Sequence, residues 1–375
     1  MSYITHLNIQ HLRNIEALEL SPNPQLNFFH GQNGAGKTSI LEAVQLLSTA
    51  RSFRSSKTRT LIQHDKDSLT VFARIERSKL SHTLGLVKSA KGETLIRVDS
   101  RSIYSSSELA ALLPVLKLDA DTFSILEGSP SHRRSLLEWL MFHVEHSYHD
   151  LWKGYQSCLK QRNILLRRGK IDYLEIGVWD VQLVAFALKI EKLRQGVFER
   201  FRQVLLPYIA DFGFIKSDLF ELRYINGWHS RAFAVSGDIT EADYNKALKA
   251  NFERDCKSGF TNIGSHRFDL MFLDEGRAVS DVLSRGQKKT LLIAIISAIA
   301  NMCEQASGEK PIFLLDDLSS ELDENNLNSL FSWLIGFKAQ CFITSVQPTA
   351  FTNLDCDLSQ SNMFHVKHGE VTLKE

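Results

Sequence analysis

The chain has 375 residues, of which 43% are hydrophobic and 23% are charged, and its formal net charge at pH 7 is +1. This composition is ordinary for a soluble globular protein with one large or two modest domains. A near-neutral chain supplies no long-range attraction to nucleic acid, so any such binding needs a local basic patch.

The cysteines and the apolar runs indicate the cellular compartment of the protein. The five cysteines are odd in number and none forms a C-x-x-C pair, so reduced thiols are expected rather than disulfides or a zinc site. The longest apolar run, 291–300, is about half as long as a bilayer crossing requires. The N-terminus lacks a charged segment followed by an apolar stretch, so no secretory signal is expected. We therefore expect a cytoplasmic protein without a membrane partner.

The first part of the chain reads as strands that lead into a helix. Apolar residues alternate with polar ones at 7–9 and at 18–20, and an apolar segment at 26–29 runs directly into a glycine-rich turn. From 40 to 47 the apolar residues recur at helical spacing. The sequence therefore predicts strand, loop and helix in this order.

The middle of the chain changes from strands to helices. Period-two alternation over 68–98, with a turn at 88–92, predicts an antiparallel meander. Apolar residues at 184–204 keep a spacing of three to four and predict a helix of about 30 residues that ends at Pro207. Residues 208–262 are mixed in pattern.

Strands and helices alternate again near the end of the chain. Residues 312–315 form an apolar run that ends in two aspartates, and 341–343 form a second apolar run. Continuous apolar strands that alternate with helices predict a parallel sheet covered on both faces.

The glycine-rich turn matches the pattern G-x-x-x-x-G-K-[ST] in full. Its glycines let backbone N–H groups point inward around phosphate oxygens, and the next helix directs its positive end at them. Lys37 is predicted to reach the β and γ phosphates, and Thr38 to coordinate Mg²⁺. The predicted nucleotide-binding residues are Gly31, Gln32, Asn33, Gly34, Ala35, Gly36, Lys37, Thr38 and Ser39. The predicted cofactors are therefore ATP and Mg²⁺.

The two aspartates after 312–315 have the form of a Walker B motif. Asp316 is expected to hold Mg²⁺ together with Thr38. Asp317 is placed to orient or deprotonate the attacking water, so Asp317 and Lys37 are the predicted catalytic residues. Many such ATPases carry Glu at this position, and the shorter Asp predicts slow hydrolysis.

A segment that precedes an apolar helix resembles the ABC signature Leu-Ser-Gly-Gly-Gln. Ser284 is expected at the helix N-cap, where its hydroxyl, the Gly286 amide and the helix dipole face a γ-phosphate. In ABC ATPases this phosphate belongs to the other subunit. The residues predicted to act in trans are Ser284, Arg285, which replaces a glycine, Gly286 and Gln287. An ordinary helix cap is the alternative, but the order P-loop, signature, Walker B favours the signature.

The segment 320–323 resembles the D-loop that crosses a dimer interface, through Ser320 and Asp323. Taken alone, this segment is more typical of a helix-capping turn. The switch histidine expected after the next strand is replaced by Thr344 and Ser345, and no Q-loop glutamine is identifiable. Sensing of the γ-phosphate is therefore unassigned.

Several segments together resemble the bacterial RecF family, and the resemblance spans nearly the whole chain. They are the P-loop, 50–54, 128–134, the signature and 315–323. The loop 264–270 is also similar to the family's G-P-H-R-D-D-L, but Ser265 replaces the proline and Phe268 replaces an acid.

The resemblance implies an α/β fold with an ABC-type ATPase head like that of SMC proteins. This head contains a mixed sheet with the P-loop and an antiparallel β subdomain. Because the motifs lie at both ends of the chain, the mainly helical middle is expected to be an inserted second lobe. The expected boundaries are 1–118 for the part of lobe I with Walker A, 119–262 for helical lobe II, and 263–375 for the part of lobe I with the signature, Walker B and D-loop.

The resemblance also implies an ATP-dependent homodimer that binds double-stranded and gapped or junction DNA. Family function is recombinational repair of gapped DNA, in which RecA is helped to load at single-strand/double-strand junctions. The implied partners are RecR, and functionally RecO and RecA. The implied activity is slow, DNA-stimulated ATP hydrolysis without nuclease activity, in a cytoplasmic, nucleoid-associated protein.

Two basic runs are candidates for DNA contact. Arg51 and Arg54 follow the P-loop helix, and for them DNA contact and a structural or nucleotide-linked role are both open. The run at 160–170 is more typical of a solvated surface. No recognition-helix motif is present, so backbone or structure-selective binding is expected.

A transporter-type ABC nucleotide-binding subunit is the alternative function, because it would share the three motifs. The missing switch histidine and the large helical insertion argue against it. A nuclease-linked ATPase would need a metal-binding carboxylate domain after the ATPase motifs, for which the sequence leaves no room before residue 375.

Overall fold

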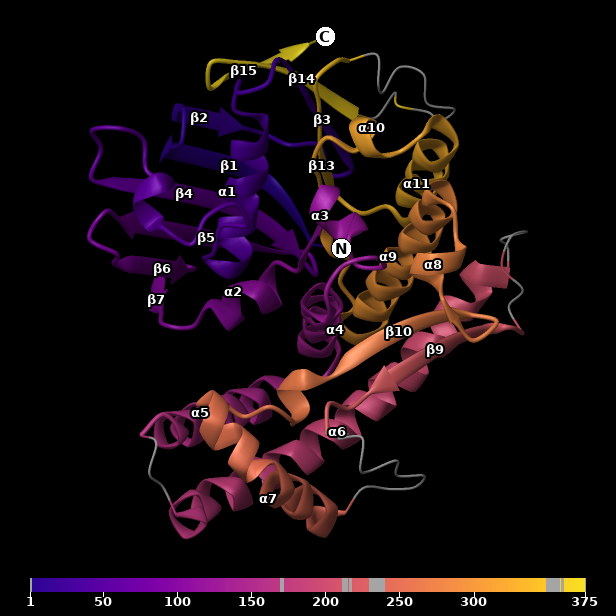
Figure 1. Cartoon of the computed structure of the whole chain (residues 1–375). Coiled ribbons are helices and arrows are strands. Elements are labelled where there is room, and N and C mark those ends of the chain that lie inside the picture. The colour runs from indigo at the N-terminus through magenta and orange to yellow at the C-terminus, as the bar shows by residue number, and fades with distance from the viewer. Residues whose placement is uncertain are drawn as a thin grey trace. The chain divides into compact units, whose positions relative to one another are not determined.

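The computed structural model describes residues 2–168, 172–210, 215, 218–228, 240–348, 358 and 361–374. The chain divides into two compact units (Figure 1). The first unit joins Met1–Ser124 to Arg285–Glu375, and the second is Ile125–Ser284. Each unit has its own sheet and helices, and each is described by itself.

The first sheet of the first unit is antiparallel, in the order β2-β1-β4-β5-β6-β7. Its strands are β1 (Tyr3–Leu12), β2 (Ile15–Leu20), β4 (Ser68–Arg77), β5 (Leu80–Ser89), β6 (Thr94–Val98) and β7 (Arg101–Ile103). In β4 the alternate residues Leu69, Val71, Ala73 and Ile75 are buried, because successive side chains point to opposite faces. The predicted meander over 68–98 and its turn are confirmed.

The second sheet of the first unit has the order β15-β14-β3-β13-β12-β8. Its strands are β3 (Leu26–His30), β8 (Val115–Leu118), β12 (Ile312–Leu315), β13 (Cys341–Ser345), β14 (Ser361–Lys367) and β15 (Glu370–Lys374). Five of them run parallel, and β15 pairs antiparallel with β14. Every residue of β3, β12 and β13 is buried, as expected for central strands covered on both faces.

Helix α1 (Lys37–Thr49) lies between the two sheets (Figure 1). Its apolar residues share one core with β1, β4 and β5 on one side and with β3, β12 and β13 on the other. The opposite face of the second sheet is covered by α11 (Glu324–Phe337), where Phe331 packs against Phe28 with ring centroids 5.9 Å apart. The P-loop helix is therefore fixed at the centre of the first unit.

Helix α9 (Arg285–Ser307) packs beside α11. Among the described residues it is long and apolar enough to cross a membrane by length and composition, but 67% of that window is buried inside the structure. This burial is typical of the core helix of a globular protein. The remaining elements of the unit are the 3-10 turn η1 (Thr58–Thr60), α2 (Ser106–Leu112), α3 (Ala120–Phe123) and α10 (Leu318–Glu321).

The second unit is mainly helical. It contains α4 (Pro130–Val144), α5 (Tyr148–Leu166), α6 (Tyr173–Ala210), β9 (Phe220–Ile225), α7 (Glu241–Ser258), the 3-10 turn η2 (Ser265–Arg267), β10 (Asp269–Asp274), β11 (Arg277–Ala278) and α8 (Val279–Val282). Its strands form a small antiparallel sheet in the order β11-β10-β9.

Three sequence-based boundaries differ from the structure. Helix α6 continues past Pro207 to Ala210, because a proline removes one backbone hydrogen bond while burial of Leu205 and Ile209 holds the last turn in place. Residues 263–284 belong to the second unit rather than to the ATPase lobe, because β10 pairs with β9. Residues 119–124 belong to the first unit.

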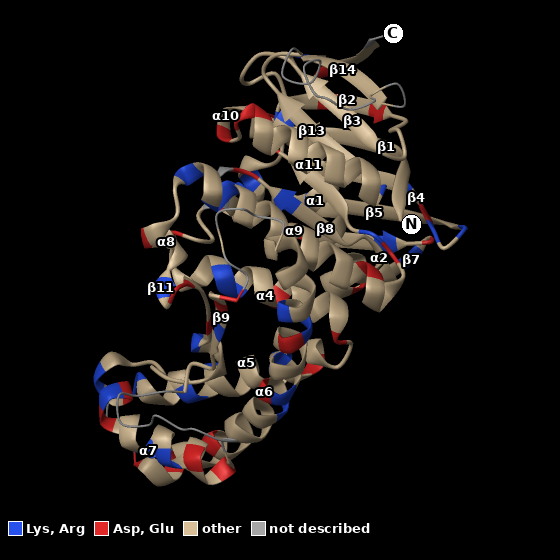
Figure 2. Cartoon of the chain, turned by 90° about the vertical axis from the view of Figure 1, so that its right-hand side faces the viewer, with Lys and Arg blue, Asp and Glu red and all other residues tan. Residues whose placement is uncertain are grey.

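The second basic run does not form a continuous positive surface. Arg162 is fully buried and forms ion pairs with Asp180 on α6, at 2.6 Å, and with Asp255 on α7, at 2.7 Å. Lys170 lies outside the described residues. Figure 2 shows basic and acidic segments mixed along α7. The solvated-surface interpretation therefore fits the exposed members of this run, while Arg162 joins three helices.

Candidate functional site

The turn between β3 and α1 encloses the side chain of Lys37. Its Nζ donates to the backbone oxygen of Gly31 at 2.6 Å and to that of Gln32 at 3.0 Å. The residue is only 7% exposed, and burial lowers the pKa of Lys37, while the charges of Asp317 and Asp316 act in the opposite direction. The ammonium therefore lies within the turn, between the backbone and the two carboxylates.

Two hairpin turns hold the P-loop from outside. Asn14, between β1 and β2, donates from Nδ2 to the Gly34 oxygen at 3.0 Å. The backbone N–H of Gly369, between β14 and β15, donates to the Ala35 oxygen at 2.8 Å. At Gly31 a Cβ atom would lie 2.2 Å from the backbone oxygen of Val366, so only glycine fits there.

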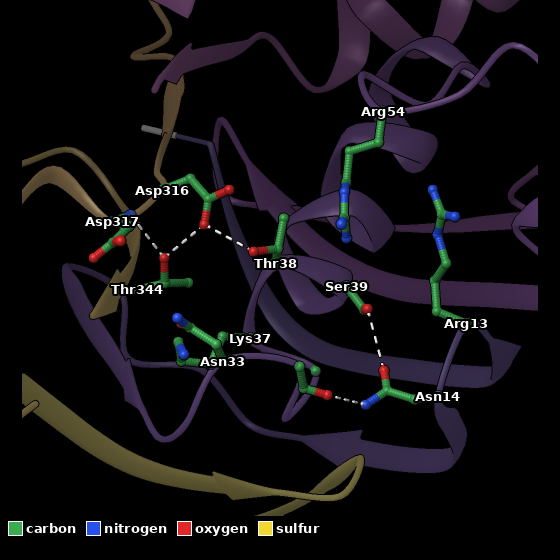
Figure 3. Close-up of a pocket in the computed structure, with 12 residues that line it drawn as sticks. Arg13, Asn14, Asn33, Lys37, Thr38, Ser39, Arg54, Asp316, Asp317 and Thr344 are labelled. Carbon is green, nitrogen blue, oxygen red and sulfur yellow. Dashed lines mark hydrogen bonds between the residues drawn. The ribbon is translucent and has the colours of Figure 1, made fainter. Parts of the chain in front are cut away.

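The Walker B aspartates meet the P-loop helix at the carboxyl ends of the strands (Figure 3). Thr38 Oγ1 donates to Asp316 Oδ1 at 3.0 Å. Thr344, at the end of the neighbouring strand β13, donates from Oγ1 to the same oxygen at 2.7 Å. The Thr344 hydroxyl in turn accepts from the backbone N–H of Asp317 at 2.9 Å. Four polar groups from three elements thus converge on one point.

The donor set at this point fits Mg²⁺. The Thr38 hydroxyl and the Asp316 carboxylate are hard oxygen ligands, and Mg²⁺ is usually held by one or two carboxylates with substrate phosphates and water. The helix N-terminus at Gly36, which has φ 117°, presents backbone N–H groups at the same place.

A pocket of about 360 Å³ opens over these groups. It is lined by Arg13, Asn14, Asn33, Gly34, Gly36, Lys37, Thr38, Ser39, Arg54, Asp316, Asp317 and Thr344. The wall combines cations, amide groups and carboxylates, which suits a polyanion that carries a divalent cation. Gly31, Gln32 and Ala35, also predicted for the site, complete the turn behind this wall.

The predicted trans-acting residues lie around the start of α9. Ser284 directly precedes the helix, and Arg285, Gly286 and Gln287 form its first turn. The last three belong to the same unit as the pocket, yet they are not among its described lining residues.

The predicted D-loop is tied to the same helix. Asp323 caps α11 by accepting from the backbone N–H of Asn326 at 2.9 Å, and Asn326 Oδ1 accepts from Thr290 Oγ1 on α9 at 2.7 Å. Hydrogen bonds to Asn326 lower the pKa of Asp323. Ser320 donates from Oγ to the backbone oxygen of Asp317 at 2.8 Å. The D-loop therefore connects the Walker B end to α9.

The structure separates the two arginines that follow α1. Arg54 lines the pocket, whereas Arg51 is exposed and is not among the lining residues. Arg51 lies near Lys88, whose pKa is lowered mainly by burial and further by that neighbouring charge.

Sequence reasoning missed Arg13, Asn14 and Thr344 as site residues. A partial signal existed for Thr344, because it ends a strand parallel to β12 and carboxyl ends of parallel strands share one edge of a sheet. For Arg13 and Asn14 no local pattern distinguishes a hairpin turn that contacts the P-loop from any other turn.

Comparison with known proteins gives one family over nearly the whole chain. The family model for the RecF/RecN/SMC N terminal domain matches residues 3–372. A protein of Cellvibrio japonicus named DNA replication and repair protein RecF is 38% identical over 98% of the chain and 99% of its own length. One of the same name from Teredinibacter turnerae is 39% identical over 100% of the chain and 97% of its own length.

Solved structures agree in fold. The recombination mediator protein RecF with ATP, of the RecFOR pathway, is 25% identical and superposes with a TM-score of 0.86 over 100% of the chain and 98% of its own length. An Smc head bound to the C-winged helix domain of ScpA is 14% identical, with a TM-score of 0.55 over 99% of the chain and 97% of its own length. The predicted ABC-type ATPase head is therefore confirmed.

Proposed function

Because the chain belongs to the RecF family of DNA replication and repair proteins, we propose that its pocket binds ATP with Mg²⁺ and hydrolyses it slowly. The relatives that match over nearly their full length are named DNA replication and repair proteins, which argues against the transporter-type alternative. The observation that best supports this proposal is that Lys37, Thr38 and Asp316 converge on a single polar pocket.

Five of the residues that line the pocket have roles that their chemistry supports. Lys37 and the amides of the P-loop hold the β and γ phosphates, since the loop already directs the ammonium into the turn. Thr38 and Asp316 would hold Mg²⁺, which neutralises charge on the phosphates when bound. Asp317 orients the attacking water or accepts its proton. Thr344 fixes Asp316 by a hydrogen bond and binds the Asp317 amide.

The conformation of Asp317 supports a specialised role. Its φ of 49° lies in the left-handed region, which costs a non-glycine residue free energy although aspartate tolerates it better than most. Its amide is held by Thr344 and its carbonyl oxygen by Ser320. The backbone therefore fixes the side chain at the pocket.

We further propose that two copies close on ATP, each contributing its signature to the other's pocket. Ser284, Gly286 and the dipole of α9 offer hydrogen-bond donors for a γ-phosphate, and no described residue of 285–287 lines the pocket of its own unit. The bond between Asn326 and Thr290 would let the D-loop and the signature helix move as one body.

The proposed biological role is recombinational repair of gapped DNA in the cytoplasm, at the nucleoid. The proposed partners are double-stranded and gapped or junction DNA, RecR, and functionally RecO and RecA. The structural relative described as part of the RecFOR pathway supports these partners by similarity. Arg51, which is exposed and outside the pocket, stays a candidate for DNA contact.

Light scattering of the pure protein with ATP and Mg²⁺, with and without a gapped duplex, tests the proposal. We expect a monomer that dimerises only with ATP, and more readily on DNA. Lys37→Met, which keeps the side-chain length but removes the only ammonium of the cradle, should abolish ATP binding and dimerisation. Lys91→Met, in the exposed turn before β6, is the matched control. Normal ATP affinity in Lys37→Met would contradict the site, and a mass unchanged by ATP would contradict the shared pocket.

A further inference from the structure

A buried carboxylate lies on the P-loop helix one turn after Thr38. Glu42 is 0% exposed, and its position in α1 places it on the same face as Thr38. A buried carboxylate is costly unless it is both paired and hydrogen-bonded. The partners of Glu42 therefore indicate what it is for.

The first partner is Arg13, in the turn between β1 and β2. Its Nε donates to Glu42 Oε2 and its Nη2 to Glu42 Oε1, both at 2.9 Å, and its Nη1 donates to the Thr60 oxygen at 2.8 Å. The hydrogen bond to Glu42 raises the pKa of Arg13. Arg13 lines the pocket, but its charge is compensated by Glu42 and all three guanidinium nitrogens are engaged.

The second partner is Ser52, in the loop after α1. Its hydroxyl donates to Glu42 Oε1 and accepts from the backbone N–H groups of Arg54, at 2.9 Å, and Ser55, at 3.0 Å. A hydroxyl has one proton and two lone pairs, so this serine uses its full capacity. By fixing the proton, Glu42 turns both lone pairs of Ser52 towards the loop amides.

The loop held in this way presents Arg54 to the pocket. Figure 3 shows the side chains of Arg54 and Arg13 on the same side of the pocket, near Thr38 and Ser39. Within the part of the chain that the structure describes, no hydrogen bond or ion pair engages the guanidinium of Arg54, in contrast to that of Arg13. Arg54 is thus the cation that is available to an anionic ligand on this side.

We propose that Glu42 is a positioning residue for the phosphates of the nucleotide, acting through Ser52 on Arg54 while it neutralises Arg13. The inference rests on the proposed nucleotide site and deepens it. It assigns Arg54 to the nucleotide and leaves DNA contact to residues such as Arg51. If Glu42 only neutralised Arg13 in the core, removal of the Ser52 hydroxyl would leave the affinity for ATP unchanged.

A double-mutant cycle on the full-length protein separates these two cases. ATP affinity is measured by calorimetry with Mg²⁺ for Ser52→Ala, Arg54→Ala and the double variant. We expect each single variant to bind ATP about tenfold more weakly, since each loses one charge-assisted contact or the loop geometry that provides it. The double variant should bind no more weakly than Arg54→Ala, because Ser52 acts through Arg54. Wild-type affinity in Ser52→Ala, or losses that multiply in the double variant, would overturn the proposal.

Two further variants control for folding. Ser52→Thr keeps the hydroxyl and should retain affinity within about twofold, whereas a loss equal to that of Ser52→Ala would contradict the hydroxyl relay. Ser89→Ala removes a comparable turn hydroxyl, which accepts from the Lys91 N–H at 3.0 Å away from the pocket, and should bind ATP like the wild type. A loss in Ser89→Ala equal to that in Ser52→Ala would make the effect general destabilisation and overturn the relay.

Lys37→Met distinguishes failure of this inference from failure of the proposed function. If the wild type binds ATP no better than Lys37→Met, the nucleotide site itself is wrong. If only Lys37→Met loses binding while Ser52→Ala binds like the wild type, the site stands and the role of Glu42 is refuted.

Discussion

Thr344 Oγ1 donates to Asp316 Oδ1 at 2.7 Å, and this bond joins the ends of β12 and β13, which are separated along the chain by α10 and α11. The same hydroxyl accepts from the backbone N–H of Asp317 at 2.9 Å. One side chain thus sets the position of the residue proposed to hold Mg²⁺ and of the residue proposed to orient water. Thr344 therefore links both aspartates to β13.

The first prediction concerns Thr344→Val. Valine has the same shape without the hydroxyl, so the Asp317 amide loses its acceptor and Asp316 loses a donor. We expect kcat for ATP hydrolysis to fall by about 10- to 100-fold, because misplaced catalytic groups affect the transition state most, while the Kd for ATP changes by less than about threefold. Steady-state hydrolysis and equilibrium binding measure the two effects.

Thr5→Val is the matched control for this substitution. It removes a hydroxyl that donates to a backbone oxygen at 3.2 Å within the first sheet, away from the pocket. Hydrolysis should remain at the wild-type rate in this variant. A Thr344→Val protein that hydrolyses ATP normally would show that the bond to Asp316 is not needed for the reaction.

The second prediction concerns the turn between β14 and β15, which braces the P-loop. At Gly369, with φ 84°, a Cβ atom would lie 2.3 Å from the Asn14 oxygen. Gly369→Ala should therefore push this hairpin away from Ala35 and weaken ATP binding by about tenfold or more, as measured by calorimetry. The reason is that the P-loop loses the N–H donor at Ala35 and the close contact with the Asn14 turn.

Gly92→Ala controls for backbone strain in this test. Gly92 has a similar φ of 93°, but nothing lies within 4 Å of its Cβ position in the turn between β5 and β6. Both alanines impose a left-handed conformation that costs about 1–2 kcal/mol, so both should lower the thermal unfolding midpoint. Only Gly369→Ala should lose ATP affinity, and equal losses in both variants would contradict the bracing role.

The parts of the site that are contiguous in sequence could be predicted. The residues that come from separate segments of the chain could not. Residues 31–39 carry a motif whose spacing alone implies the turn, and the aspartates at 316 and 317 follow an apolar strand. Thr344 and Arg13 reach the pocket, and Arg13 reaches Glu42, only because the strands and the β1–β2 turn assemble around α1. No pattern in one sequence specifies this order of strands, because neighbours in a parallel sheet are joined by long crossovers.

Predictions also went wrong where tertiary packing outweighed a local rule. Pro207 is a helix breaker by local geometry, yet the buried residues of the last turn of α6 keep the helix intact. The segment 263–284 is expected in the ATPase head, whereas in the structure it groups with the second unit, because β10 pairs with β9. In both cases the deciding contact lies outside the local pattern.

The third prediction concerns the proposed trans contact. Ser284→Arg places a long charged side chain at the start of α9, where the opposing nucleotide would approach. We expect ATP to bind with wild-type affinity, because Lys37, Thr38 and Asp316 of the same chain line the pocket and are unchanged, while ATP-dependent dimerisation is lost in light scattering. Ser329→Arg, on the exposed face of α11, is the control and should dimerise normally. If Ser284→Arg forms the same fraction of dimer as the wild type, the shared pocket is refuted.

The last prediction concerns a buried acid in the second unit. Glu191 on α6 accepts a hydrogen bond from the Tyr224 hydroxyl at 2.9 Å and is 5% exposed. Burial raises the pKa of Glu191 from 4.5 to about 7, although the bond to Tyr224 and the charge of Arg194 act in the opposite direction. Because the folded-state pKa lies above the unfolded value, the folded protein binds more protons than the unfolded chain between these two pH values. The contribution of Glu191 to the free energy of unfolding is therefore fully present below pH 4.5 and is lost as the pH rises through 7.

Glu191→Gln should remove this dependence, because glutamine can accept the Tyr224 hydrogen bond without a charge. As the pH rises from 4.5 to 8, the variant should become more stable relative to the wild type. The gain in its relative free energy of unfolding should be up to roughly 3 kcal/mol. Thermal or denaturant unfolding at several pH values, followed by tryptophan fluorescence, measures this difference. Glu175→Gln, exposed on the same helix, should follow the wild type at every pH. If the Glu191→Gln difference is the same at pH 5 and pH 8, Glu191 ionises in the folded protein as it does in the unfolded chain, and its burial is compensated by Tyr224 and Arg194.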